Sequence, residues 1–263
     1  MSAFEAVLRR ERAVVALAMA ALAALAWAYV WRGAGMGMPA LHTTALALFP
    51  HLQPDMPGAM PSALPVVVAM WWVMMVAMMT PSVAPLVLLY GRVVRHHGGR
   101  PDAGGGFPLA LLAGYLAVWG LFSVAAALAQ TLLQPAGLIS SMMLWSKNAL
   151  LSASVLCLAG IYQFTPLKRA CLAQCRGPVQ FLTRHWRPGR AGAFAMGVKH
   201  GAYCVGCCWL LMALLFVGGV MNLAWIAALS FLVLAEKAAP SGELIGKVSG
   251  AVLLVWAAAT LLA

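Results

Sequence analysis

The stretch LPVVVAMWWVMMVAMMTPSVAPLVLLY, residues 64–90, decides the fold class because no charged side chain interrupts it. A helix needs about 20 mostly apolar residues to cross the hydrocarbon core of a bilayer. Pro81 and Pro85 fall inside the stretch, and a proline removes a backbone donor and crowds the preceding turn. The sequence therefore predicts a membrane-spanning helix that kinks or ends near Pro81.

The same character extends over the whole chain of 263 residues, of which 63% are hydrophobic and 9% are charged. Soluble domains carry roughly a quarter charged residues. Ala and Leu dominate, and no alternation of apolar and polar residues is long enough for a membrane strand. We therefore expect a single all-α domain over residues 1–263, a polytopic transmembrane helix bundle of about seven spans. The expected spans are residues 13–31, 64–90, 107–133, 149–164, 203–220, 223–235 and 248–263.

The basic residues indicate how these spans are oriented. Short cytoplasmic loops of membrane proteins collect Lys and Arg. If the N-terminus is cytoplasmic and the C-terminus periplasmic, 15 of the 17 basic residues fall on the cytoplasmic side, and only Arg32 and Lys147 fall outside. The formal net charge of +11 then reflects topology, and we expect no nucleic-acid partner. The first apolar segment is longer than the core of a signal peptide, so we expect it to remain uncleaved.

Two loops differ from the rest in composition. The outer loop, residues 33–62, is rich in Gly and Pro and also carries side chains that bind soft metals. Its Met, His and Asp residues are Met36, Met38, His42, His51, Asp55, Met56 and Met60. The basic cytoplasmic loop, residues 165–200, is the longest polar segment, and Pro166 predicts that a short helix begins there.

The six cysteines all map to the cytoplasmic side or to the membrane interior, away from an oxidising compartment that would pair them. One group shares a helix face at the inner membrane boundary, with spacings of three or four residues: His200, Cys204, Cys207 and Cys208. Cys171 and Cys175 form a second pair of this spacing. Thiolate and imidazole together suit Cu(I) or Zn(II). Free Cys is also a common packing residue at helix contacts, an alternative that stays open and that we favour for Cys157.

Met70, Met74 and Met78, hereafter the methionine row, recur every four residues in the second span, with Met75 and Met79 on an adjacent row. A row of Met at helical spacing is often adaptable core packing. Five Met within ten residues is nevertheless dense, and the Met-x-x-x-Met spacing is similar to that of the pore of eukaryotic copper transporters, without homology. Thioether sulfur binds Cu(I), so the row is a candidate path for that ion.

Four stretches of sequence together resemble a known bacterial family. They are MWWVMMVAMMTPS at 70–82, YQFTPLKRAC at 162–171, HWRPG at 185–189 and HGAYCVGCCW at 200–209. The family is the predicted metal-binding integral membrane proteins (domain of unknown function 2182), and the resemblance covers about residues 60–240. It implies a multi-pass protein of the bacterial inner (cytoplasmic) membrane, but no established substrate.

Two functions follow from these patterns. In the first, the protein binds and transports a soft metal, Cu(I) before Zn(II), between the outer Met-rich face and the inner thiolates, with a periplasmic or cytoplasmic metal chaperone as partner. In the second, Cys204 and Cys207 form a redox dithiol that carries electrons across the bilayer. A scaffold subunit whose sulfur residues only pack is a third option. No nucleophile–base pair can be argued, which favours a binding protein over an enzyme. Glu236 is expected at an inner membrane end beside Lys237, so no carboxylate lies deep enough in a span to suggest proton coupling.

Overall fold

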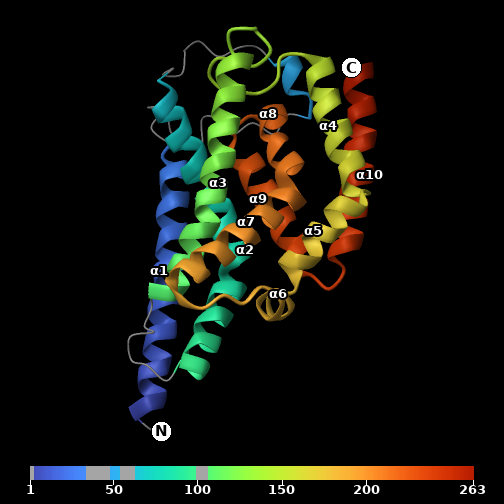
Figure 1. The fold of residues 1–263 in the computed structure, drawn as a ribbon. Helices are drawn as coiled ribbons and strands as arrows, with labels where there is room; N and C mark the ends of the chain where they lie inside the picture. Colours follow the sequence, from blue (N-terminus) through green and yellow to red (C-terminus); the bar gives the residue numbers. More distant parts are fainter. Residues whose placement is uncertain (1–2, 34–47, 54–62, 99–105) are drawn as a thin grey trace.

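The computed structural model describes residues 3–33, 48–53, 63–98 and 106–263, and the regular structure in these ranges is entirely helical, as expected. The elements are α1 (Ala3–Trp31), η1 (Pro50–Leu52), α2 (Leu64–Gly98), α3 (Gly106–Leu133), α4 (Ala149–Gln163), α5 (Pro166–Arg176), α6 (Pro178–His185), α7 (Gly189–Ala213), α8 (Leu215–Gly218), α9 (Leu223–Ala238) and α10 (Gly242–Leu262). The long helices lie side by side in one bundle, with the N-terminus and the C-terminus at opposite ends (Figure 1).

Five helical segments of the described chain are long and apolar enough to cross a membrane: 13–31, 64–94, 107–133, 189–218 and 242–262. A sixth is obtained if α4 and α5, which meet at a bend of 66°, are counted as one broken span. The expected count of seven spans, and the orientation of the termini, are therefore not confirmed. The difference arises because α4 and α9, with 15 and 16 residues, reach only about 22–24 Å at 1.5 Å per residue, less than the ~30 Å of a bilayer core.

Capping residues fix where the short helices begin. The side chain of Asn148 accepts a hydrogen bond from the backbone of α4, and that of Asn222 accepts one from α9. Thr165 caps α5 in the same way, and Pro166 follows it at the first helical position. Thr165 thus sets the bend between α4 and α5, which turns α5 towards α7.

Helix α2 passes through Pro81 and Pro85 without ending, and continues to Gly98. Pro81 has no N–H to donate to the carbonyl of Ala77, one turn earlier. The indole Nε1 of Trp27, on α1, donates to that carbonyl at 3.0 Å instead. Of the two expected outcomes, a kink or an end near Pro81, the end is wrong, since a neighbouring helix supplies the donor that proline lacks.

Glycines allow α3 and α7 to approach closely. A Cβ added at Gly197 would lie 2.0 Å from the carbonyl oxygen of Leu111, and one added at Gly114 would lie 2.2 Å from that of Phe194. Small residues at such contacts are typical of helix packing in membranes. This contact holds the cysteine-bearing part of α7 against Tyr115 of α3.

Candidate metal centre

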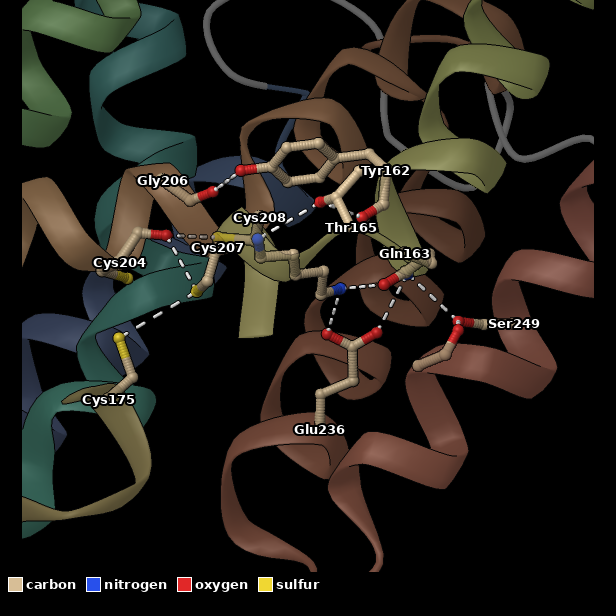
Figure 2. Close-up of polar contacts among 12 residues, drawn as sticks. Tyr162, Gln163, Thr165, Cys175, Cys204, Gly206, Cys207, Cys208, Glu236 and Ser249 are labelled. Atoms are coloured by element: carbon tan, nitrogen blue, oxygen red, sulfur yellow. Dashed lines mark hydrogen bonds and ion pairs between the residues drawn. The ribbon is translucent and has the colours of Figure 1, made fainter. Parts of the chain in front are cut away.

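The four α7 residues expected to bind metal are all buried: His200 and the three cysteines Cys204, Cys207 and Cys208. The thiols of Cys207 and Cys208 donate to the carbonyl oxygen of Cys204, at 3.1 and 3.0 Å (Figure 2). Both sulfurs therefore lie beside the helix backbone at the level of Cys204. The i+3 and i+4 spacing accounts for this arrangement, because residues three and four apart lie on one face of a helix.

Helix α5 adds a fourth sulfur. Its Cys175 lies 4.0 Å from Cys207, sulfur to sulfur (Figure 2), and also faces the thiol of Cys204. Cys175, Cys204, Cys207 and Cys208 are hereafter the sulfur cluster. Cys171, one turn earlier on α5, packs against the backbone at Gly206 and lies at the edge of the cluster.

Cys204 has two polar neighbours that the sequence analysis did not single out. Lys237 Nζ of α9 lies 2.9 Å from the sulfur, and the hydroxyl of Tyr115 of α3 lies 3.0 Å from it. Both neighbours also contact the hydroxyl of Ser82 of α2, each at 3.2 Å. Four helices thus meet at this sulfur. In the sequence, Lys237 follows an apolar run and indicates topology, whereas Tyr115 lies within the apolar run 107–133 and gives no signal of its own.

His200 lies on the same face of α7 but in an aromatic environment. Its ring centroid is 4.9 Å from that of Phe181 on α6 and 5.9 Å from that of Tyr115. Its buried Nδ1 has no hydrogen-bond partner in the part of the chain that the structure describes. Among the described residues, the ring therefore keeps a buried nitrogen without a hydrogen-bond partner, between the rings of Phe181 and Tyr115. His185, one turn after Phe181, hydrogen-bonds the carbonyl of that residue at 3.1 Å.

The methionine row lies in the protein core, with all three side chains at most 3% exposed. The Met78 end of the row adjoins the surroundings of Cys204, because Tyr115 also donates to the carbonyl of Met79, at 3.3 Å. The Met70 end lies beside Trp71, whose indole donates to Gln130 of α3 at 2.8 Å. Within the outer loop of residues 33–62, only Gly33 and residues 48–53 are described, so the Met residues of that loop lie outside the described part, and His51 packs against Phe49.

A second polar group fixes α5 in place. Lys168 Nζ of α5 forms an ion pair with Glu236 of α9 at 2.7 Å, and both side chains are only 2% exposed. Gln163 accepts from the same ammonium, and donates to Glu236 at 3.0 Å and to Ser249 of α10 at 3.1 Å (Figure 2). Glu236 is thus buried within the bundle rather than at an exposed membrane end, and its charge is neutralised by Lys168.

The sulfur cluster brings potential metal ligands together in pairs and does not form a complete coordination shell. Among the described residues, no three His, Cys, Asp or Glu side chains are placed to hold one ion together. None of the six cysteines is in a disulfide. A third sulfur would reach an ion between Cys175 and Cys207 by side-chain rotation.

Comparison with known families adds an independent observation. A family model described as PpoB2, copper chaperone, matches residues 68–260. The matched region includes the methionine row and all six cysteines. No curated protein and no solved structure matches the chain. The copper-related character expected from the motifs is confirmed, whereas the family name first given to them is not.

Proposed function

The chain belongs to the copper-chaperone family PpoB2, and from this premise we propose that it binds Cu(I) in the sulfur cluster between α5 and α7 and passes it to a partner. The helices that are long and apolar enough to span a membrane support an exchange at or within a bilayer. The bacterial inner membrane is the proposed location, and the partner would be a periplasmic or cytoplasmic metal chaperone. Zn(II) is the competing ion that the same ligands would accept.

The proposal rests on the 4.0 Å separation between the sulfurs of Cys175 and Cys207. A thiolate binds a borderline metal ion at about 2.3 Å, so two sulfurs that share an ion lie at most about 4.6 Å apart. At 4.0 Å the two sulfurs form an angle of about 120° at a shared ion. This is the angle between ligands in trigonal planar coordination, so a third ligand would fit in the same plane. The pair therefore fits an ion without movement of either helix.

The third ligand would come from Cys204 or Cys208. Both are buried on α7, and the thiol of Cys208, like that of Cys207, donates to the carbonyl of Cys204. Metal binding removes the thiol protons, so the bonds from Cys207 and Cys208 to the Cys204 carbonyl would be given up. A change of side-chain rotamer then suffices to direct a sulfur at the ion. Thiolate ligands of this kind select Cu(I) over hard cations.

The methionine row is the proposed route to this cluster. Successive thioethers four residues apart lie about 6 Å apart along the helix axis. Ser82, one turn beyond Met78, contacts Tyr115 and Lys237, which both contact the sulfur of Cys204. Two hydrogen-bonded contacts, from Ser82 to Tyr115 or Lys237 and from there to Cys204, therefore separate the Met78 end of the row from the sulfur cluster. The direction of movement stays open in this proposal.

The same separation favours a second candidate, a thiol–disulfide carrier. A disulfide needs two sulfurs at about 2.05 Å, so Cys175 and Cys207 could form one after a small rotation of their side chains. This pair differs from the Cys204 and Cys207 dithiol expected from the sequence. On α7, Cys204 is directed at Lys237, whereas Cys207 is directed at Cys175. A redox function would therefore use one thiol from each helix.

The deciding experiment measures metal in the purified protein. Cu(I) is supplied without oxygen to the wild type and to the double variant Cys175→Ser/Cys207→Ser, and bound copper is determined by elemental analysis. We expect about one tightly bound ion in the wild type and none in the double variant. Cys157→Ser, on α4, is the matched control and should bind like the wild type. Full copper content in the double variant would reject the site, and a reversible disulfide without copper binding would favour the redox carrier.

A further inference from the structure

The charge of Lys237 is directed at a sulfur atom. Its Nζ lies 2.9 Å from the sulfur of Cys204 and 3.2 Å from the hydroxyl of Ser82. The neighbouring carboxylate of Glu236 is paired with Lys168 instead, 2.7 Å away. In the described part of the chain, Lys237 Nζ therefore has the sulfur of Cys204 and the hydroxyl of Ser82 as its partners, and no carboxylate.

A simpler explanation is that Lys237 caps its own helix. Basic residues in the last turn stabilise a helix by interacting with its free carbonyl groups. Arg176 of α5 already provides this interaction, because its Nη2 donates to the carbonyls of Ala239 and Pro240, both at 2.8 Å. Lys237 extends away from these groups towards α7. Helix capping therefore does not explain its position.

We propose that Lys237 sets the charge selectivity of the copper site, so that the site favours a monovalent over a divalent ion. This inference rests on the proposed function. It explains why ligands that would also accept Zn(II) prefer Cu(I) at this site. Lys237 acts by repulsion and is not a ligand. An ammonium group that stays in the site repels a doubly charged ion about twice as strongly as a singly charged one.

The geometry limits how weak this repulsion can be. An ion bound to Cys204 at about 2.3 Å lies no farther than about 5.2 Å from Nζ, because Nζ is 2.9 Å from that sulfur. At this distance, with an effective dielectric constant of about 20, each unit of charge on the ion lowers its binding constant roughly 100-fold. Zn(II) is therefore disfavoured about 100-fold more than Cu(I). The repulsion also weakens Cu(I) binding, which suits a protein that must give the ion up.

The test compares two metals in one set of variants. Binding constants for Cu(I), without oxygen, and for Zn(II) are measured by competition with chelators in the wild type, Lys237→Met and Lys237→Arg. Lys247→Met, which removes an exposed lysine of α10, is the matched control. We expect the ratio of the Cu(I) constant to the Zn(II) constant to fall about 100-fold in Lys237→Met, and to be kept in Lys237→Arg and Lys247→Met. A purely structural loss would weaken both metals and cancel in this ratio.

An unchanged ratio in Lys237→Met would overturn the inference while leaving the copper site intact. If that variant does not fold, Lys237→Gln decides in its place, because it keeps a hydrogen-bond donor and removes only the charge. The proposed function fails separately, if the Cys175→Ser/Cys207→Ser variant binds copper as tightly as the wild type or if the wild type binds none. In that case the inference is rejected with it.

Discussion

Removing the carboxylate of Glu236 should have two effects. It should destabilise the fold, and it should weaken the attachment of α5, the helix that brings Cys175 to the sulfur cluster. The side chains of Lys168 and Glu236 are each 2% exposed, and their charged atoms lie 2.7 Å apart. Loss of one partner from a buried ion pair typically costs about 3–5 kcal/mol, because the remaining charge stays buried without compensation. Lys168 keeps the side-chain oxygen of Gln163 as a neutral partner. We therefore expect Glu236→Ala to lower the free energy of unfolding by about 3 kcal/mol, the low end of that range.

Two further variants separate charge from packing. Glu243→Ala removes an exposed carboxylate from the first turn of α10 and should cost less than about 1 kcal/mol. Lys168→Met/Glu236→Leu replaces both charges with apolar side chains and should recover most of the lost stability. Unfolding by denaturant in detergent micelles, followed by circular dichroism, measures all three. The reasoning is refuted if Glu236→Ala costs no more than Glu243→Ala, or if the double variant is no more stable than Glu236→Ala.

The same variants report on the metal site, because Lys168 anchors the helix that carries Cys175. Arg176 fixes the other end of α5 to the end of α9. When Glu236 is lost, α5 keeps only this second attachment among the polar contacts to α9. We expect Cu(I) affinity to fall in Glu236→Ala and to return in the double variant. If copper affinity does not fall and recover together with the free energy of unfolding in these variants, the position of α5 does not control metal binding.

Three other predictions follow from features described above. Replacing the whole methionine row by Leu should cost under about 1.5 kcal/mol of stability for each swap, but should lower copper tolerance in cells; unchanged tolerance would leave the row as core packing. A periplasm-dependent phosphatase fused after Ala263 should be active and one fused after Arg190 inactive, and activity in the reverse pattern would contradict the proposed orientation. Gly197→Ala should destabilise the fold by about 3 kcal/mol, because the new methyl group would meet a backbone carbonyl of α3. Gly120→Ala is the control, since its new methyl group would have a nearest contact of 3.4 Å, and thermal unfolding should show a far smaller loss of stability.

The helices themselves were predictable, because each apolar run in the sequence overlaps an observed helix, and the run at 203–220 overlaps two, α7 and α8. Helix ends were harder to place. The two prolines of α2 weakened the case for one continuous helix, and the donor that compensates for Pro81 comes from Trp27, 50 residues away. The sequence around Pro81 does not predict such a partner. Likewise, the apolar content of α4 and α9 suggested two complete spans, although their observed lengths fall short of a bilayer core.

The candidate site was predictable where its residues share one helix. The spacing of Cys204, Cys207 and Cys208 on α7 brings the thiols of Cys207 and Cys208 to the carbonyl of Cys204. The distance from Cys175 to this group depends on the bend between α4 and α5, which no spacing rule provides. Lys237 was counted only as a topology charge, since its contact with Cys204 joins two helices through tertiary packing. Contacts of that kind require a structure.

The bond from Trp27 to the Ala77 carbonyl has a consequence for how this chain and its relatives can vary. Trp27 lies before residue 68, where the family match begins, while Pro81 lies inside it. In lipid, no water replaces a missing donor, so a carbonyl freed by proline needs a partner from the protein. If residue 81 were not proline, its own N–H would bond Ala77 and the indole would be dispensable. The two positions should therefore covary, with tryptophan retained at 27 in those homologues that retain proline at 81.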